Sequence, residues 1–175
     1  MTDITYYYIA QVVGFLGLIV MMYAFQREER SQILHTQTYG SLLFSIHFYL
    51  IGGFVGSLLS LTVVARNSVF KHKPDKPWAQ SVLWPFFFAL LSIIILASAW
   101  EGWISLLPVT GMIIASYAMW LDDAHEIKKY IILSSALWMP YSLFHQAYPS
   151  LINQILICAS AIFATVKNTY YKKAE

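Results

Sequence analysis

Apolar stretches of 16 to 20 residues follow one another along almost the whole chain, with short polar segments between them. A helix needs about 20 mostly apolar residues to cross the hydrocarbon core of a membrane. Of the 175 residues, 58% are hydrophobic and only 11% are charged, whereas roughly a quarter are charged in soluble domains. The chain is therefore predicted to be an all-α polytopic membrane protein with a single membrane domain over residues 1–175.

The apolar stretches predict seven transmembrane helices, at residues 6–25, 38–54, 55–70, 81–100, 103–121, 130–148 and 151–166. As one helix, residues 38–70 would be about 50 Å long, too long for a single span of a roughly 30 Å core. The pair Gly52-Gly53 is therefore interpreted as a tight turn. The segment from Ala147 to Ser150 poses the same choice between a turn and a weak point within one helix.

The positions of the charged residues favour seven spans over six. With seven spans, all eleven Lys and Arg residues fall on one side: Arg27, Arg30, Arg66, Lys71, Lys73, Lys76, Lys128, Lys129, Lys167, Lys172 and Lys173. Asp3 and Glu101 remain on the other side. Because basic loops stay in the cytoplasm, the amino terminus is expected outside and the carboxyl terminus inside. The same distribution argues against nucleic acid as a partner, because the basic clusters flank apolar runs.

Two parts of the chain resemble each other. Residues 17–25 and 111–119 share glycine, isoleucine, tyrosine and alanine at matching positions, and an acidic pair follows each. After a one-residue adjustment, Ser41 matches Ser134 and Ser57 matches Ser150. Residues 6–70 and 103–166 are thus interpreted as two three-helix halves joined by a linker helix at 81–100. An odd number of spans separates them, so they form a parallel repeat.

Several motifs are similar to those of a known family. They are Gln26-Arg-Glu-Glu-Arg30, Tyr39-Gly-Ser, His47-Phe-Tyr-Leu-Ile-Gly52, Arg66 in the third span and Leu106-Leu-Pro-Val-Thr-Gly111. On these motifs the chain resembles the YgjV family of bacterial inner-membrane proteins. The three-plus-one-plus-three plan also resembles the SWEET sugar transporters and the PnuC vitamin transporters. The resemblance implies a multi-pass protein of the bacterial inner membrane with a SWEET-like (MtN3/PQ-loop) transporter fold.

The SWEET-like pattern is only partly present. The proline of its proline-glutamine pair is missing in both halves, at Phe25-Gln26 and near Trp120-Leu121. Its pocket asparagine is matched by Asn153, whereas the first-half equivalent is Ser60. The resemblance therefore implies an asymmetric pocket.

Polar and aromatic side chains near the middle of the spans are the candidate site, because polar groups at membrane depth are costly and tend to mark pathways. Pro140 is expected to kink the sixth span between two aromatic residues. The predicted substrate-binding residues are His47, Tyr49, Trp138, Tyr141, Asn153 and Gln154. The alternative is that these side chains join helices through hydrogen bonds worth about 0.6 kcal/mol each.

Arg66 is the one charge well inside an apolar stretch. It is interpreted either as snorkelling to the nearby membrane surface or as a gate or anion contact. No cofactor or metal is expected. The single cysteine, Cys158, cannot build a Cys-based metal site. The segment from Asp122 to Glu126 also lacks the HExxH spacing of a zinc site.

The leading functional hypothesis is a transporter of a small polar or aromatic metabolite, such as a sugar, a nucleoside or a vitamin-like compound. It would work by alternating access between the two halves. The alternatives are a non-transport receptor or assembly protein of the same fold, and a membrane enzyme, for which the sequence carries no signature. The expected partners are a small-molecule substrate and the lipid bilayer, and association with further copies of the chain is left open.

Overall fold

The computed structural model describes residues 2–24, 26–27 and 29–172. These residues form seven α-helices, which confirms the predicted number within the described part of the chain. They are α1 (Thr2–Ala24), α2 (Arg30–Leu50), α3 (Phe54–Phe70), α4 (Leu83–Ser98), α5 (Leu106–Trp120), α6 (Ala124–Phe144) and α7 (Tyr148–Lys172), with 3-10 helices η1 (Pro77–Gln80) and η2 (Trp103–Ser105). Phe25, in the first predicted span, and Lys173, in the basic set, lie outside the described residues.

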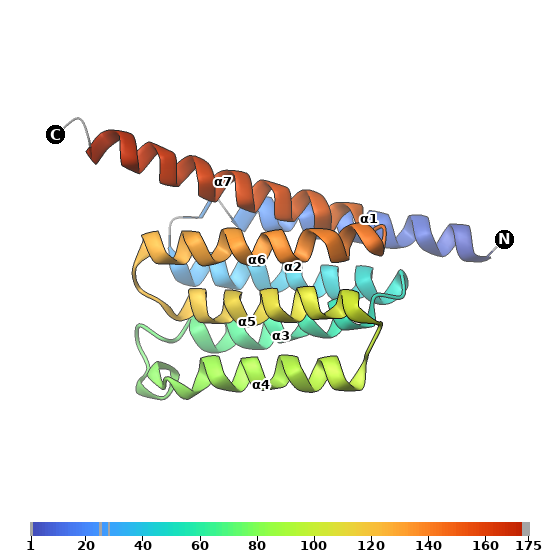
Figure 1. The fold of residues 1–175 in the computed structure, drawn as a ribbon, viewed down its shortest axis with the longest axis horizontal. Helices are drawn as coiled ribbons and strands as arrows, with labels where there is room; N and C mark the ends of the chain where they lie inside the picture. Colours follow the sequence, from blue (N-terminus) through green and yellow to red (C-terminus); the bar gives the residue numbers. More distant parts are fainter. Residues whose placement is uncertain (1, 25, 28, 173–175) are drawn as a thin grey trace.

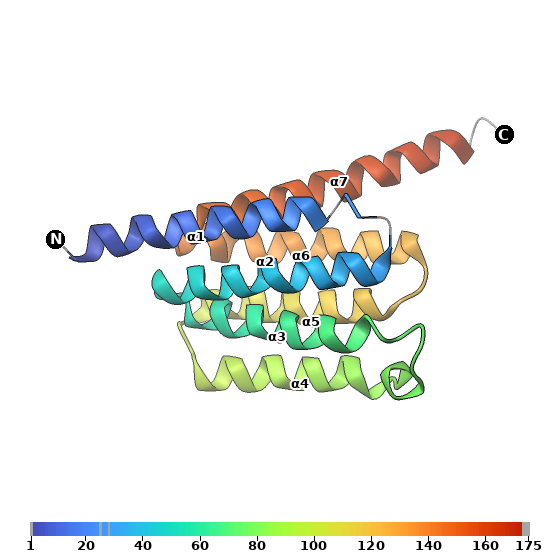
Figure 2. The same cartoon turned by 180° about the vertical axis from the view of Figure 1, so that it is seen from behind.

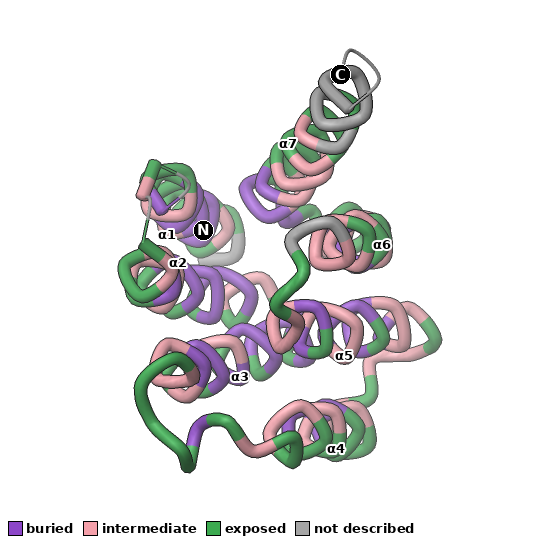
Figure 3. Tube along the Cα trace, turned by 90° about the vertical axis from the view of Figure 1, so that its left-hand side faces the viewer, coloured by how far each residue is buried: buried purple, intermediate pink, exposed green. Residues whose placement is uncertain are grey.

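Successive helices run in opposite directions through one bundle, so α1 begins at one end and α7 finishes at the other (Figures 1 and 2). Each helix packs mainly on its neighbours in the sequence. Contacts between distant segments join α1 to α7 and α3 to α5. Viewed end-on, α1, α2 and α3 lie on one side of the bundle and α5, α6 and α7 on the other, while α4 lies against α3 and α5 (Figure 3).

Short turns separate the helices at the two ambiguous places in the sequence. Gly52 has a φ of +81° between α2 and α3, a conformation that glycine adopts without steric cost. Residues 145–147 separate α6 from α7, and Gln146 has a φ of 53°. Both places are therefore breaks between helices, but the second break comes earlier than expected, because residues 148–150 already form the first turn of α7.

Several helix boundaries differ from the apolar stretches. α2 begins at Arg30 and α6 at Ala124, well before the predicted residues 38 and 130. Residues 103–105 form η2, so α5 begins only at Leu106. Hydropathy marks where a helix is apolar, but the backbone hydrogen bonds continue through polar residues. α2 also ends at Leu50, before the predicted residue 54, so His47, expected midway along its span, lies in the last turn of α2.

Large apolar side chains cover the outside of the bundle. On α4, Leu83, Phe86 and Leu90 are each more than half exposed. Soluble monomers rarely expose contiguous apolar surface on this scale. Two stretches, Ile4–Ala24 and Trp103–Trp120, are long and apolar enough to cross a membrane by length and composition, and Phe54–Phe70, Leu83–Ser98 and Tyr148–Ala164 are apolar but shorter. The exterior is thus suited to contact with lipid.

Basic residues gather at the end of the bundle where α1, α3 and α5 finish, which we call the basic end. The connections at this end, together with the starts of α2 and α6, carry Arg27, Arg30, Lys71, Lys73, Lys76, Lys128 and Lys129. Glu101 lies in the α4–α5 connection at the opposite end, which we call the Glu101 end. The side of the membrane that each end faces stays a prediction.

Candidate functional site

A cavity of about 330 Å³ lies between the two groups of three helices. Its lining comes from α1, α2 and α3 on one side and from α5, α6 and α7 on the other, and α4 contributes none of the described lining residues. It extends from Phe48 and Ser150, near the Glu101 end, to Ile33 and Met119, near the basic end. This is where the sequence placed a cavity and a helix outside it.

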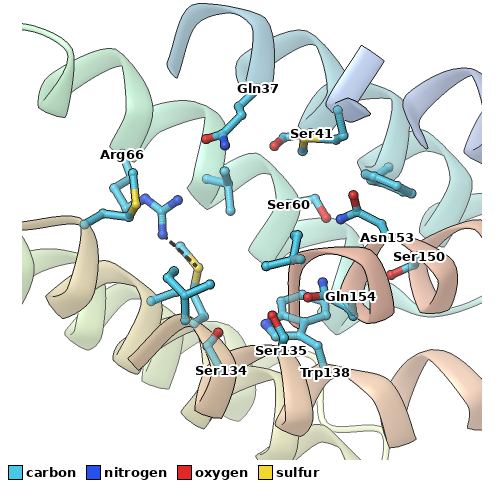
Figure 4. A pocket seen from close by; sticks show the side chains of 18 of the residues that line it. Gln37, Ser41, Ser60, Arg66, Ser134, Ser135, Trp138, Ser150, Asn153 and Gln154 are labelled. Atoms are coloured by element: carbon cyan, nitrogen blue, oxygen red, sulfur yellow. Dashed lines mark hydrogen bonds between the residues drawn. The ribbon is translucent and has the colours of Figure 1, made fainter. Parts of the chain in front are cut away.

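The lining combines apolar walls with hydroxyl and amide groups. The polar lining residues are Gln37, Ser41, Ser60, Ser134, Ser135, Ser150, Asn153 and Gln154 (Figure 4). The sequence reasoning missed most of the serines. A signal was present, because Ser41 and Ser134 are matched positions of the two similar segments and both line the cavity. Hydrogen-bonding groups on apolar walls are typical of small-molecule sites.

Asn153 and Gln154 lie in the second turn of α7 and line the cavity. Asn153 is only 5% exposed. In the described part of the chain, no hydrogen bond from another residue reaches either side-chain amide. Buried amides normally have partners, and helix-joining amides would be bonded to a neighbouring helix. The arrangement therefore leaves both amides free to bind a ligand.

Arg66 lines the same cavity from α3, one turn before the helix ends at Phe70. Its side chain is 5% exposed, so it lies inside the bundle and does not snorkel to the surface. Its Nη2 and Nε donate to the neighbouring Asn67 Oδ1 at 3.2 and 3.4 Å, and its Nη1 lies 4.0 Å from Met112 Sδ. The guanidinium thus has only weak, neutral partners.

Trp138 also lines the cavity, from α6, and is 8% exposed. Its ring packs on Phe48 and Tyr141, with ring centroids 6.1 Å apart in both pairs. These contacts fix the indole at the part of the cavity nearest the Glu101 end. Four of the seven predicted site residues, Arg66, Trp138, Asn153 and Gln154, are therefore brought together.

The other three predicted residues lie outside the cavity lining, which corrects their placement. Tyr49 is 63% exposed on the outer face of α2. His47 is fully buried, and its Nδ1 donates to Ala10 O of α1 at 2.7 Å. Tyr141 is fully buried between α3 and the α4–α5 connection. His47 and Tyr49 were expected near the middle of a span over 38–54, but α2 runs from Arg30 to Leu50, so both lie in its last turn.

A hydrogen-bond network at the Glu101 end was not predicted. Glu101 Oε1 accepts from Val55 N at 3.0 Å, and Tyr141 Oη donates to Glu101 Oε2 at 2.8 Å. The same hydroxyl accepts from Gly56 N at 2.8 Å, and His145 Nε2 lies 3.4 Å from Glu101 Oε2. Glu101 and Tyr141 thereby satisfy amides in the first turn of α3, which lack partners within the helix. The network joins α3, α6 and the α4–α5 connection between the cavity and the Glu101 end of the bundle.

Basic side chains join the helices at the other end. Arg30 Nη2 of α2 donates to Met119 O at 2.7 Å, and Lys73 Nζ donates to Trp120 O at 2.6 Å. Lys73 also pairs with Asp122 at 2.9 Å, and this partner lowers the pKa of the Asp122 carboxyl. Cations at the last carbonyls of a helix such as α5 are stabilising. These contacts lie where the cavity approaches the basic end.

Metal ligands are not clustered in the described residues: no group of three or more His, Cys, Asp or Glu could hold an ion. The segment from Asp122 to Glu126, which was weighed as a metal site on its sequence, includes His125, whose side chain lies outside the described residues. Cys158 is a free, half-buried cysteine on α7.

A bundle of seven helices with an apolar exterior and a partly polar central cavity defines a multi-helix integral membrane protein. The family model for Imp-YgjV, described as bacterial inner membrane protein, matches residues 8–172. The chain therefore belongs to the Imp-YgjV family and is a protein of the bacterial inner membrane. No curated protein and no solved structure matches it significantly.

Proposed function

We propose that this protein transports a small polar or aromatic metabolite by alternating access between α1–α3 and α5–α7, with α4 as the linker. The observation that carries the proposal is the cavity between these two groups of helices, with the unpartnered buried amide of Asn153 in its wall. Transporters built from repeats place their site at the interface of the repeats. The cavity lies between the two groups of helices that the proposal takes as the repeats.

Serine bridges between the second and third helices of each group support a SWEET-like parallel repeat. Ser45 and Ser57 join α2 to α3 through hydroxyl oxygens 3.1 Å apart. Ser142 and Ser150 join α6 to α7 in the same way at 3.0 Å. Ser57 and Ser150 are matched positions in the sequence. The other two serines are not matched, because Ser45 corresponds to Trp138 and Ser142 lies one turn further along its helix. What the two groups share is a serine bridge made by the matched serine in the first turn of the third helix.

The close approach of the first two helices in each group is also repeated. A Cβ on Gly17 would lie 3.3 Å from Gly40 O of α2, and one on Gly111 would lie 3.1 Å from Ser134 O of α6. Small residues at such positions let helix backbones pack closely in membranes. The matched glycines therefore have the same role in α1 and α5.

Polar contacts at the two ends are suited to act as alternating gates. Tyr141 links α6 to α3 at the Glu101 end, while Arg30 links α2 to α5 at the basic end. Both contacts cross between the two groups of helices. Rocking one group against the other would break one set of contacts while the other set remained closed.

The test begins with a thermal-shift screen of the purified protein against sugars, nucleosides, vitamins and amino acids. A solute that binds only the folded state raises its melting temperature. Each stabilising solute is then assayed for flux into proteoliposomes. Transport predicts saturable flux. Stabilisation without flux would contradict transport and indicate a receptor.

A further inference from the structure

Arg66 gives the central cavity a charge that no carboxylate in the described residues balances. It is the only charged residue among those described as lining the cavity. The ion pairs of the described residues join Lys73 to Asp122 and Lys129 to Glu126, and Glu101 lies beside His145 at the Glu101 end. None includes Arg66.

The local partners of Arg66 do not compensate its charge. Two of its nitrogens share one oxygen of the neighbouring Asn67, and a third faces the thioether of Met112. A guanidinium has five donors and stays protonated in proteins, and a thioether is only a weak acceptor. Burial of a charge without an opposite charge is strongly unfavourable. The positive charge of Arg66 therefore has no compensating negative charge among the described residues that line the cavity.

The polar groups across the cavity are neutral. Asn153 and Gln154 lie opposite Arg66 in Figure 4, with the hydroxyls of Ser41 and Ser60 between them. One positive charge on one side and amides on the other match a molecule with one anionic end and a hydrogen-bonding body. Guanidinium groups bind carboxylates and other oxyanions through paired hydrogen bonds.

We propose that the cavity binds a small organic monoanion, whose oxyanion group pairs with Arg66 and whose polar body reaches Asn153 and Gln154. This inference rests on the proposed function, because it names the substrate class of the same cavity. It excludes uncharged sugars and nucleosides as the principal ligands.

The test measures the charge preference of the cavity with reagents that need no knowledge of the natural ligand. In a Cys158→Ser background, Val63→Cys places the only thiol in the cavity wall. Residues three apart on a helix are neighbours, with Cβ atoms about 5 to 6 Å apart, so this thiol lies beside Arg66. Its labelling rate is measured with the anionic 2-sulfonatoethyl and the cationic 2-(trimethylammonium)ethyl methanethiosulfonate at low ionic strength. Ser68→Cys, exposed on the same helix, is the control site.

The anionic reagent is expected to react faster than the cationic one at Val63→Cys, relative to their rates at Ser68→Cys. The ratio of the two rates should fall at least about tenfold with Arg66→Gln, because a unit charge at this distance acts strongly in a low-dielectric site. Arg66→Lys should preserve it. Because the ratio compares two reagents at the same thiol, any effect of Arg66 on the reactivity of that thiol cancels. The comparison of the two sites with Arg66 intact remains decisive if Arg66→Gln fails to fold.

Equal relative rates at the two sites, or a ratio that Arg66→Gln leaves unchanged, would overturn the anion inference. The transport proposal would then stand, because flux of an uncharged solute does not depend on Arg66. Failure of both reagents to reach Val63→Cys would contradict an accessible cavity, and with it both proposals.

Discussion

The hydroxyl of Tyr141 donates a 2.8 Å hydrogen bond to Glu101 while it accepts one of 2.8 Å from Gly56 N. One side chain of α6 thus holds both the α4–α5 connection and the first turn of α3. Because Tyr141 is fully buried, water does not replace these bonds. The contact closes the bundle between the cavity and the Glu101 end.

Tyr141→Phe should therefore lower the stability of the protein. It leaves the Gly56 amide and a Glu101 oxygen without their partner, a loss of about 1 to 3 kcal/mol. Thermal or denaturant unfolding in detergent measures the change. Tyr49→Phe, at an exposed position of α2, is the matched control and should stay within about 0.5 kcal/mol of the parent. Equal effects of the two substitutions would show that the network contributes nothing to the stability of the fold.

Asn153→Ala should weaken binding of a ligand from the screen. Loss of a buried hydrogen-bonding partner costs about 1 to 3 kcal/mol, or roughly 5- to 150-fold in affinity. Isothermal titration of the purified variants measures this. Gln11→Ala is the control, because Gln11 is a buried amide that bonds Gln146 O outside the cavity lining. If Asn153→Ala lowers the melting temperature and leaves affinity unchanged, Asn153 joins helices and binds no ligand.

Gly111→Ala should destabilise the protein and also weaken ligand binding. Its Cβ would lie 2.8 Å from Trp138 Cδ1 and 3.1 Å from Ser134 O, and overpacking of this kind costs about 1 to 3 kcal/mol. The displaced indole belongs to the cavity wall. Gly17→Ala, the matched position, would meet Leu43 Cβ at 3.2 Å and should affect stability alone. The same loss of affinity in both variants would contradict a specific role of Trp138.

The pair Lys73–Asp122 should make a small, pH-dependent contribution to stability. Lys73 lowers the pKa of Asp122 in the folded protein, so the contribution is present above the unfolded-state pKa and is lost as the pH falls through the folded-state value. Because the Asp122 side chain is 83% exposed, the contribution is at most about 1 kcal/mol.

Unfolding of Asp122→Asn across the acid range tests this contribution. The substitution should lower stability near neutral pH and change little at the acid end. Asp75→Asn, in the α3–α4 connection, is the control. A difference from the parent that grows as the pH falls would have the wrong sign for this interaction.

Much of the architecture could be predicted because it depends on local sequence. Gly52 provides the positive φ that the turn between α2 and α3 requires, and the apolar stretches marked the seven helices. The depth of a residue could not be predicted in the same way. His47 lies in the last turn of α2 because the helix ends at Leu50, four residues before the predicted end of the span, and begins already at Arg30.

Contacts between distant helices explain the remaining differences in the candidate site. Arg66 is buried because α3 packs on α5 at that level, which hydropathy along one helix does not report. The partnership of Glu101 with Tyr141 joins residues 40 apart in the sequence. Asn153 could be chosen as a candidate from the sequence because an amide is uncommon within an apolar stretch. In the structure its side chain lines the cavity.

The most direct test of transport through the central cavity compares two substitutions on one helix. Ser60 lines the cavity, whereas Ser68 is exposed on α3. Ser60→Phe should fill part of the cavity and abolish flux of a stabilising solute into proteoliposomes, and Ser68→Phe should leave the flux unchanged. Equal flux through both variants, at matched amounts of folded protein, would contradict a transport path through this cavity.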